Sequence, residues 1–197
     1  MADYRFVTTS EIAVPRNRAW AEVSRPERWV TWWPGLNEVK QLEPGDDEGR
    51  GTLLEFVFKS FLPYTLSFRG RITLIEPPQR MEIDAIGELE GNAVYELEDL
   101  GESTRMRLTW TVKTTKTWMN VLAPIARPFF AWNHDILMKA GARGLARKLG
   151  TEVTHFDAGH PWRRPLLLGL ALSSGLGIWK LARSGSARWG SAGRIGR

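Results

Sequence analysis

Histidines and carboxylates are the side chains best suited to acid–base or metal chemistry, and this chain of 197 residues holds three histidines and no cysteine. Without cysteine there is no disulfide, no thiolate metal ligand and no cysteine nucleophile. His134 and Asp135 are neighbours in a helical pattern, in which adjacent side chains point about 100° apart, so we interpret them as a surface pair. His155 and His160 follow the main domain in a segment that has no cysteine and no third histidine to complete a typical zinc site. We therefore predict no catalytic residue and no metal site.

Signatures of cofactor and nucleic-acid binding are also missing from the sequence. The Gly-Ala-Arg-Gly run that begins at Gly141 lies in a helical pattern and lacks the Lys and Ser or Thr that complete a phosphate-binding loop. Residues 157–197 carry a net charge of +6, which leaves −1 for residues 1–156. Because the positive charge belongs to the tail, where it is sparse and interrupted by leucines, we predict no nucleic-acid partner and no cofactor.

The elements that would position a site begin with a period-two pattern over residues 4–14, which predicts a first strand. Pro15 ends this strand and begins a short helix that runs to residue 23, and a second short helix covers residues 27–33. Strand-length segments separated by short turns follow, over residues 38–43, 52–59, 65–76, 80–86, 93–99 and 104–114. Such short connections predict an antiparallel meander.

A helical period replaces the strand pattern after residue 116. Its apolar stripe consists of Trp118, Leu122, Ile125, Phe129, Trp132, Ile136 and Ala140. Pro124 and Pro128 start or kink this helix. The helix must cover the apolar face of a curved sheet of about seven strands, so the fold class is α+β.

The order of these elements resembles that of the SRPBCC superfamily, the START-like and polyketide-cyclase-like helix-grip proteins, over residues 1 to about 150. The resemblance rests on EIAVPRNRAWAEVSRPERWVTWWPGLNEV, on LEFVFKSFLPYTLSFRGRITLIEPPQRMEI and on the closing PFFAWNHDILMKAGARGLARKL. It implies a sheet that grips the long helix around an elongated cavity for apolar molecules. Some members of this superfamily cyclise or aromatise polyketide chains.

The predicted ligand-binding residues are the large side chains expected to face this cavity. From the strands they are Phe56, Phe58, Leu66, Phe68, Ile72, Met81, Ile83, Tyr95, Leu97, Met106, Leu108 and Trp110. From the long helix they are Phe129, Trp132, Asn133, Ile136 and Leu137. Two interpretations stay open, because aromatic side chains of this size either line a cavity or fill the core completely.

Catalysis would need ionisable groups inside the cavity. The polar residues expected to face inward are Tyr95, Asn133, Thr8 and Ser10, with no His, Asp, Glu or Lys among them. That is a poor set for proton transfer.

Trp20, Trp29, Trp32 and Trp33 gather in the two short helices, which flank the cavity mouth in the superfamily. They either form an aromatic gate or membrane-touching rim, or pack the short helices onto the sheet.

The carboxy-terminal tail divides into a linker over residues 151–164, an apolar segment over 165–183 and a disordered basic end over 184–197. Residues 165–179 contain no charged side chain, which fits a helix in or on an anionic membrane, a segment docked on its own domain, or disorder. No apolar signal region precedes Ser10, so we expect a cytoplasmic protein, peripheral or anchored at the inner face of the membrane through its tail.

The sequence therefore favours a module that binds or transports a hydrophobic small molecule or lipid in an internal cavity. The first alternative is a cyclase or aromatase acting on a hydrophobic substrate. The second is a partner-binding domain with a filled core.

Overall fold

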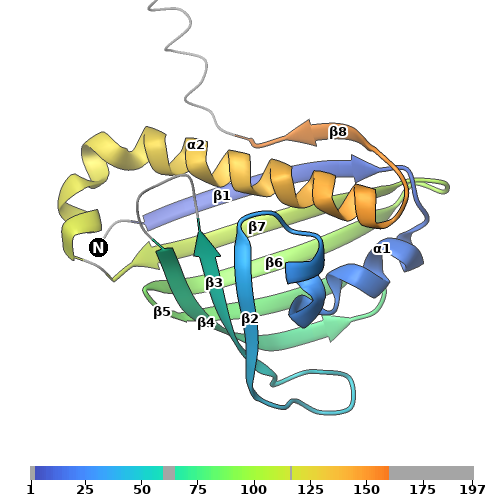
Figure 1. The fold of residues 1–197 in the computed structure, drawn as a ribbon, viewed down its shortest axis with the longest axis horizontal. Coiled ribbons are helices and arrows are strands. Elements are labelled where there is room, and N and C mark those ends of the chain that lie inside the picture. Colours follow the sequence, from blue (N-terminus) through green and yellow to red (C-terminus); the bar gives the residue numbers. More distant parts are fainter. Residues whose placement is uncertain (1–2, 60–64, 116, 160–197) are drawn as a thin grey trace, which may run out of the picture. The chain divides into compact units, whose positions relative to one another are not determined.

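An antiparallel sheet of eight strands curves around one long helix (Figure 1). The computed structural model describes residues 3–59, 65–115 and 117–159. The elements are β1 (Asp3–Ile12), α1 (Arg16–Val23), the 3-10 helix η1 (Pro26–Thr31), β2 (Leu36–Glu43), β3 (Leu53–Lys59), β4 (Thr65–Glu76), β5 (Arg80–Gly87), β6 (Leu89–Asp99), β7 (Thr104–Thr114), α2 (Thr117–Lys148) and β8 (Val153–Asp157). The predicted α+β helix-grip fold is confirmed.

The sheet has one strand more than the sequence predicts. Its order is β2-β3-β4-β5-β6-β7-β1-β8, so the meander from β2 to β7 is extended by β1 and then by β8. The added strand comes from the segment expected to be a linker, and it places Phe156 opposite Ser10 of β1. A strand edge has unpaired backbone donors and acceptors, and β8 covers these on β1.

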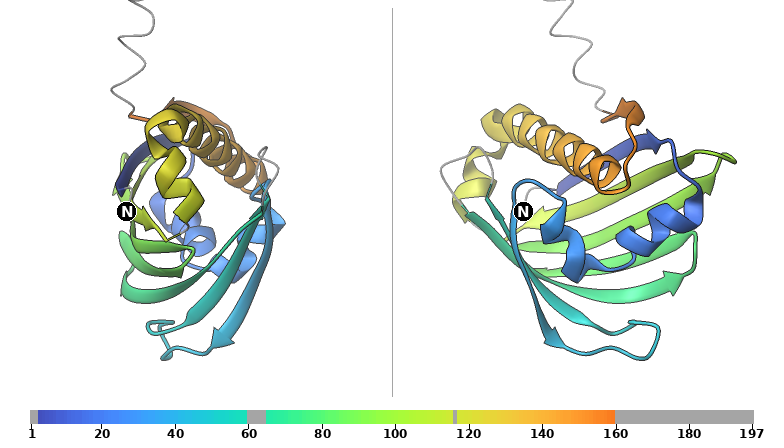
Figure 2. Two further views of the ribbon diagram at one scale, coloured as in Figure 1. Left: turned by 90° about the vertical axis from the view of Figure 1, so that its left-hand side faces the viewer. Right: turned by 45° about the vertical axis from the view of Figure 1, so that its right-hand side comes forward.

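The two faces of the sheet differ as the period-two patterns predict. On β7, Leu108 and Val112 are buried on the face towards α2. Arg105 lies on the other face, where it donates hydrogen bonds to Glu11 and Glu98 at 2.8 and 2.7 Å. The apolar side chains of β7 therefore lie on the face of the sheet that is turned towards α2. Figure 2 shows that this face is the concave one.

The two short helices connect β1 to β2. Pro15 is the N-cap of α1 with an extended backbone, and Pro26 begins η1, where its missing N–H needs no partner. The second helix is shorter than predicted because it ends at Thr31. The chain then turns so that Trp32 and Trp33 both lie in the hydrophobic core.

Helix α2 contacts the Trp32–Trp33 turn at two glycines. A Cβ atom on Gly141 would lie 2.5 Å from the Trp33 ring, and one on Gly144 would overlap the carbonyl oxygen of Trp32. The Trp33 indole N–H donates a hydrogen bond of 3.0 Å to the carbonyl oxygen of Leu137. Glycine is therefore required where the helix backbone approaches this turn most closely.

The first turns of α2 run at an angle to the rest of the helix (Figure 2). Pro128 lies within α2, and proline bends a helix because it lacks an N–H and crowds the preceding turn. This agrees with the kink that the sequence predicts.

No helix in the described ranges combines the length and hydropathy of a transmembrane segment. The predictions for residues 165–183 and 184–197 fall outside the described residues.

Candidate functional site

Three apolar chambers lie between the concave face of the sheet and the helices. We call them the tryptophan chamber, with a volume of about 60 Å³, the central chamber, of about 30 Å³, and the histidine chamber, of about 80 Å³. One water molecule needs about 10–15 Å³ by such a measure. Each chamber therefore has room for a few waters, and the interior is neither completely filled nor open enough for a lipid chain as it stands.

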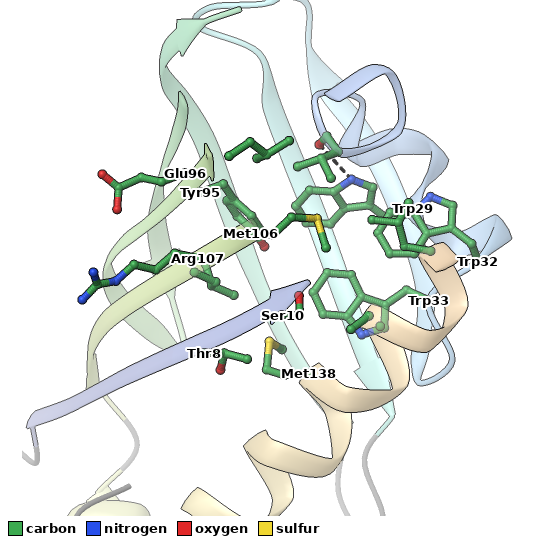
Figure 3. A pocket seen from close by; sticks show the side chains of 16 residues that line it. Thr8, Ser10, Trp29, Trp32, Trp33, Tyr95, Glu96, Met106, Arg107 and Met138 are labelled. Atoms are coloured by element: carbon green, nitrogen blue, oxygen red, sulfur yellow. Dashed lines mark hydrogen bonds between the residues drawn. The ribbon is translucent and has the colours of Figure 1, made fainter. Parts of the chain in front are cut away.

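The tryptophan chamber takes its shape from the turn after η1 (Figure 3). Trp29, Trp32 and Trp33 form one side of it, and Thr8 and Ser10 of β1 are among its polar lining residues. The Trp29 indole donates a hydrogen bond of 3.0 Å to the carbonyl oxygen of Val23, as Trp33 does to α2. These bonds hold the indoles of Trp29 and Trp33 in the arrangement seen here, so a ligand that rotates either ring has to break its hydrogen bond.

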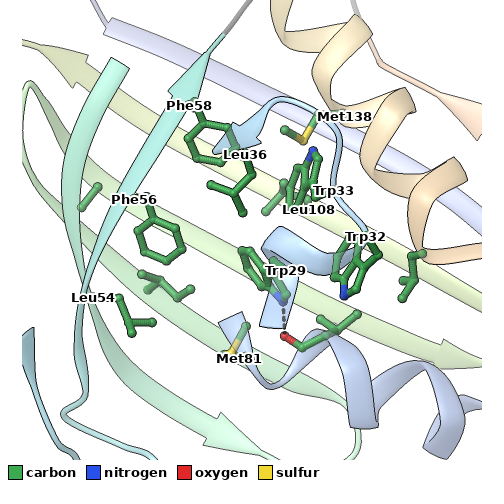
Figure 4. Packing of buried hydrophobic residues seen from close by; sticks show 14 of the residues in the cluster. Trp29, Trp32, Trp33, Leu36, Leu54, Phe56, Phe58, Met81, Leu108 and Met138 are labelled. Atoms are coloured by element: carbon green, nitrogen blue, oxygen red, sulfur yellow. Dashed lines mark hydrogen bonds between the residues drawn. The ribbon is translucent and has the colours of Figure 1, made fainter. Parts of the chain in front are cut away.

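The four clustered tryptophans pack the short helices onto the sheet. Trp20, Trp29, Trp32 and Trp33 are only 2–9% exposed, and Figure 4 shows the last three among the core side chains. The packing interpretation is confirmed. A membrane-touching rim would need exposed indoles, so that alternative is wrong for these four residues.

The central chamber is lined by aromatic rings from neighbouring strands. Phe56 stacks on Phe68 with ring centroids 5.4 Å apart, and Phe58 stacks on Phe68 at 6.0 Å. Phe56 also lies against Gly70 of β4, where a Cβ atom would be 2.8 Å from the Phe56 ring. Because Gly70 has no side chain, the Phe56 ring has room to pack against the backbone at this position.

Shared side chains connect the three chambers in a row. Trp29, Trp33 and Tyr95 line both the tryptophan and the central chamber. Phe58 and Trp110 line both the central and the histidine chamber. The three chambers are thus neighbours along the interior, and each adjacent pair has lining side chains in common.

The histidine chamber has the most varied chemistry of the three. His134 lines it, and its ring stacks on Phe6 with centroids 4.3 Å apart and an angle of 15° between the planes. Its Nδ1 atom lies 3.9 Å from Oδ1 of Asp135. Asn133 and Trp110 bring an amide and an indole N–H to the same chamber.

The interpretation of His134 and Asp135 as a surface pair is wrong. The two residues are 7% and 6% exposed. The helix contacts β1, β7 and β8, so protein covers it on more than one side and two side chains about 100° apart are both enclosed.

Most of the predicted ligand-binding residues line a chamber. Those that do are Phe56, Phe58, Leu66, Phe68, Ile83, Tyr95, Leu97, Met106, Leu108, Trp110, Asn133 and Leu137. Ile72 and Met81 lie in the core away from the chambers, and Ile136 is half-buried away from them. The side chain of Phe129 is outside the described residues. A role in ligand contact stays a prediction for all of them.

Trp132 was expected to face the cavity, and instead it is 46% exposed. The inward face of α2 is that of Phe130, Asn133, His134, Leu137, Met138, Gly141 and Leu145. This face is rotated by one residue from the stripe that the large apolar side chains indicated.

Some residues of the site are not predicted from the sequence. Phe6, Phe130 and Met138 line chambers without having been predicted to do so. The alternation along β1 was the signal that could have found Phe6.

Among the titratable groups of the chambers, Tyr95 is perturbed by its surroundings. Burial raises the pKa of the Tyr95 phenol above its ordinary value, because the phenolate would lose its hydration. Tyr95 is therefore a neutral hydroxyl at physiological pH. In the described part of the chain, no group of three or more His, Cys, Asp or Glu side chains is placed to hold a metal ion.

Comparison with known proteins gives one family and several related folds. The model of the family described as "Polyketide cyclase / dehydrase and lipid transport" matches residues 4–150. A search of curated protein sequences found no significant match.

Among solved structures, the Zhui aromatase/cyclase of a Streptomyces species has a TM-score of 0.61 at 14% identity, covering 73% of this chain and 92% of its own. A protein of Thermus thermophilus has a TM-score of 0.60 at 15% identity, covering 72% of this chain and 97% of its own. A START superfamily protein of Mycobacterium smegmatis has a TM-score of 0.51 at 15% identity, covering 66% of this chain and 94% of its own. At these identities the likeness concerns the fold.

Proposed function

The chain belongs to the polyketide cyclase/dehydrase and lipid transport family, and from this premise we propose that it binds a hydrophobic small molecule or lipid in the row of chambers under α2. The observation that carries the proposal is the sharing of side chains between adjacent chambers. Phe58 and Trp110 stand between two of them, and Trp29, Trp33 and Tyr95 between the next two. The ligand occupies the joined space once these side chains rotate.

The energetics favour such a ligand. The walls of all three chambers are mainly aromatic and aliphatic, so an apolar molecule that enters leaves water for an apolar environment at roughly 25 cal/mol per Å² of buried surface. Typical ligand sites enclose about 300–1,000 Å³. Binding therefore includes a rearrangement of ring side chains, and it selects ligands whose burial outweighs the cost of that rearrangement.

The test is to block the middle of the row. Ala93 lines the central chamber, so Ala93→Phe fills it with a ring, and we expect at least about a tenfold loss of affinity for the neutral fluorescent probe phenylnaphthylamine. Val94→Phe is the matched control, because successive strand side chains point to opposite faces.

Folding of both variants is checked by circular dichroism. Unchanged affinity in a folded Ala93→Phe variant, or no binding of any apolar probe to the wild-type protein, contradicts the proposal.

A second candidate function, the cyclase or aromatase activity, is favoured by His134. The sequence offered no acid–base group facing the interior, whereas the structure has a buried imidazole on the wall of the histidine chamber. An imidazole can take a proton from carbon next to a carbonyl.

The test is deuterium exchange into the acidic CH₂ of benzoylacetone, followed by NMR. If the wild-type protein accelerates the exchange, the His134→Gln variant should not. The control variant His155→Gln, at an exposed position, should accelerate it as the wild type does. Equal rates with and without protein would exclude this chemistry for the probe.

Membrane association of the tail is a proposal from the sequence alone. Residues 165–179 carry no charge, and Arg163, Arg164, Lys180 and Arg183 flank them. Basic flanks of this kind favour an anionic surface. The full chain should sediment with phosphatidylserine-containing vesicles and a chain lacking residues 160–197 should not. Equal sedimentation of the two would contradict the proposal.

A further inference from the structure

Two polar atoms at the histidine chamber need a partner that the described protein does not supply. Trp110 Nε1 and Asn133 Oδ1 are enclosed, and neither has a hydrogen-bond partner within the part of the chain that the structure describes. Both residues line the histidine chamber, Trp110 from β7 and Asn133 from α2. A buried donor or acceptor without a partner destabilises the protein, so such groups are normally paired with protein, water or ligand.

The chemistry of these atoms defines the group that would satisfy them. An indole N–H can only donate, so its partner must accept a hydrogen bond, whereas a carbonyl oxygen such as Oδ1 needs a donor. A hydroxyl group does both. It also fits either orientation of the Asn133 amide, whose nitrogen donates where its oxygen accepts.

The charges around the chamber argue for an uncharged ligand. No Lys or Arg is among the described residues that line it. A positive charge on His134 would already face Asp135, at 3.9 Å. A carboxylate or phosphate head would therefore lose its hydration without gaining a cation of its own, which is strongly unfavourable.

The shape of the wall indicates what carries the hydroxyl. Aromatic rings surround the chamber, and those of Tyr4, Phe6, Phe58, Trp110 and Phe130 all contribute to its lining. Flat rings pack against such a wall in the offset and edge-to-face geometries that aromatic pairs prefer.

We propose that the histidine chamber binds the hydroxyl group of an uncharged aromatic alcohol, between Trp110 Nε1 and Asn133. This inference rests on the proposed function and adds to it the polar group of the ligand and the position of that group. The apolar remainder of the molecule extends past Phe58 and Trp110 into the central chamber.

The experiment compares three ligands of nearly the same shape, β-naphthol, naphthalene and β-naphthoate, by equilibrium dialysis against the full chain at neutral pH. We expect β-naphthol to bind at least about fivefold more tightly than naphthalene, as one or two net hydrogen bonds provide. We expect β-naphthoate to bind more weakly than both.

The variants Trp110→Phe and Asn133→Leu should each reduce the preference for β-naphthol over naphthalene towards one, with little change in the affinity for naphthalene. Asn37→Leu makes the same substitution at an exposed position on β2 and should keep the preference. This inference is overturned if the wild-type protein binds naphthalene and β-naphthol with equal affinity, or if it binds β-naphthoate most tightly of the three. Either result leaves the proposed function standing. Failure of all three ligands to bind counts against both.

Discussion

Tyr95 lines two of the chambers, and its buried phenol makes the stability of the protein depend on pH. Because burial raises the pKa of this phenol, the unfolded chain loses the proton first as the pH rises. The stabilisation that Tyr95 gives is therefore fully present below about pH 10, the ordinary phenol pKa, and is lost above it.

We predict that wild-type protein loses stability faster than a Tyr95→Phe variant above pH 10. The difference in the free energy of unfolding should change by up to about 1.4 kcal/mol per pH unit. Urea unfolding at a series of pH values from 8 upward measures it. Parallel curves for the two proteins would show that the Tyr95 hydroxyl is hydrated in the folded state.

At the scale of the element, the contact of α2 with the Trp32–Trp33 turn determines which face of the helix packs against the core. A Cβ atom on Gly144 would overlap the Trp32 carbonyl oxygen, whereas in an unobstructed helix alanine is more favourable than glycine by about 1 kcal/mol. The crowded contact should reverse that preference.

We predict that Gly144→Ala destabilises the protein by about 1–3 kcal/mol, the usual cost of an overpacked site. Arg143→Ala is the control, since Arg143 is exposed in the same turn and its loss should change stability by less than about 0.5 kcal/mol. Urea unfolding compares the three proteins. A Gly144→Ala variant as stable as the wild type would mean that the turn yields easily to the helix.

Prediction from the sequence succeeds for the faces of the strands and fails for the face of α2. Strand faces follow from local alternation, as in β3, where Leu54, Phe56 and Phe58 are buried in the predicted parity. The face of α2 does not follow from its large apolar residues, because the closest contact is made at Gly141 and Gly144, which have no side chain to count.

The burial of His134 depends on how the curved sheet and β8 surround the helix. That arrangement is a tertiary property, and no local pattern around His134 encodes it.

At the scale of the molecule, β8 closes the side of the sheet next to β1. The strand is short and half exposed, so its sequence pattern is weak, and its pairing with β1 joins residues far apart in the chain. Phe156 packs against the core from this strand, and Lys139 Nζ of α2 lies 5.8 Å from the centroid of its ring.

We predict that Phe156→Ala lowers the free energy of unfolding by about 1–2 kcal/mol, less than for a fully buried ring because Phe156 is half-buried. His155→Ala, on the exposed face of the same strand, should leave it unchanged. Thermal unfolding of the full chain is the measurement. Equal melting temperatures for the two variants would show that β8 is a dispensable addition to the sheet.

The stacked indoles of Trp32 and Trp33 give the protein an optical property of its own. Their ring centroids are 5.6 Å apart with 11° between the planes, close enough for the electronic transitions of the two chromophores to couple and to produce a signed band pair in circular dichroism. Both rings border the tryptophan chamber, so a molecule that displaces either one changes the coupling. Occupancy of the interior can thus be read spectroscopically, without a label on either molecule.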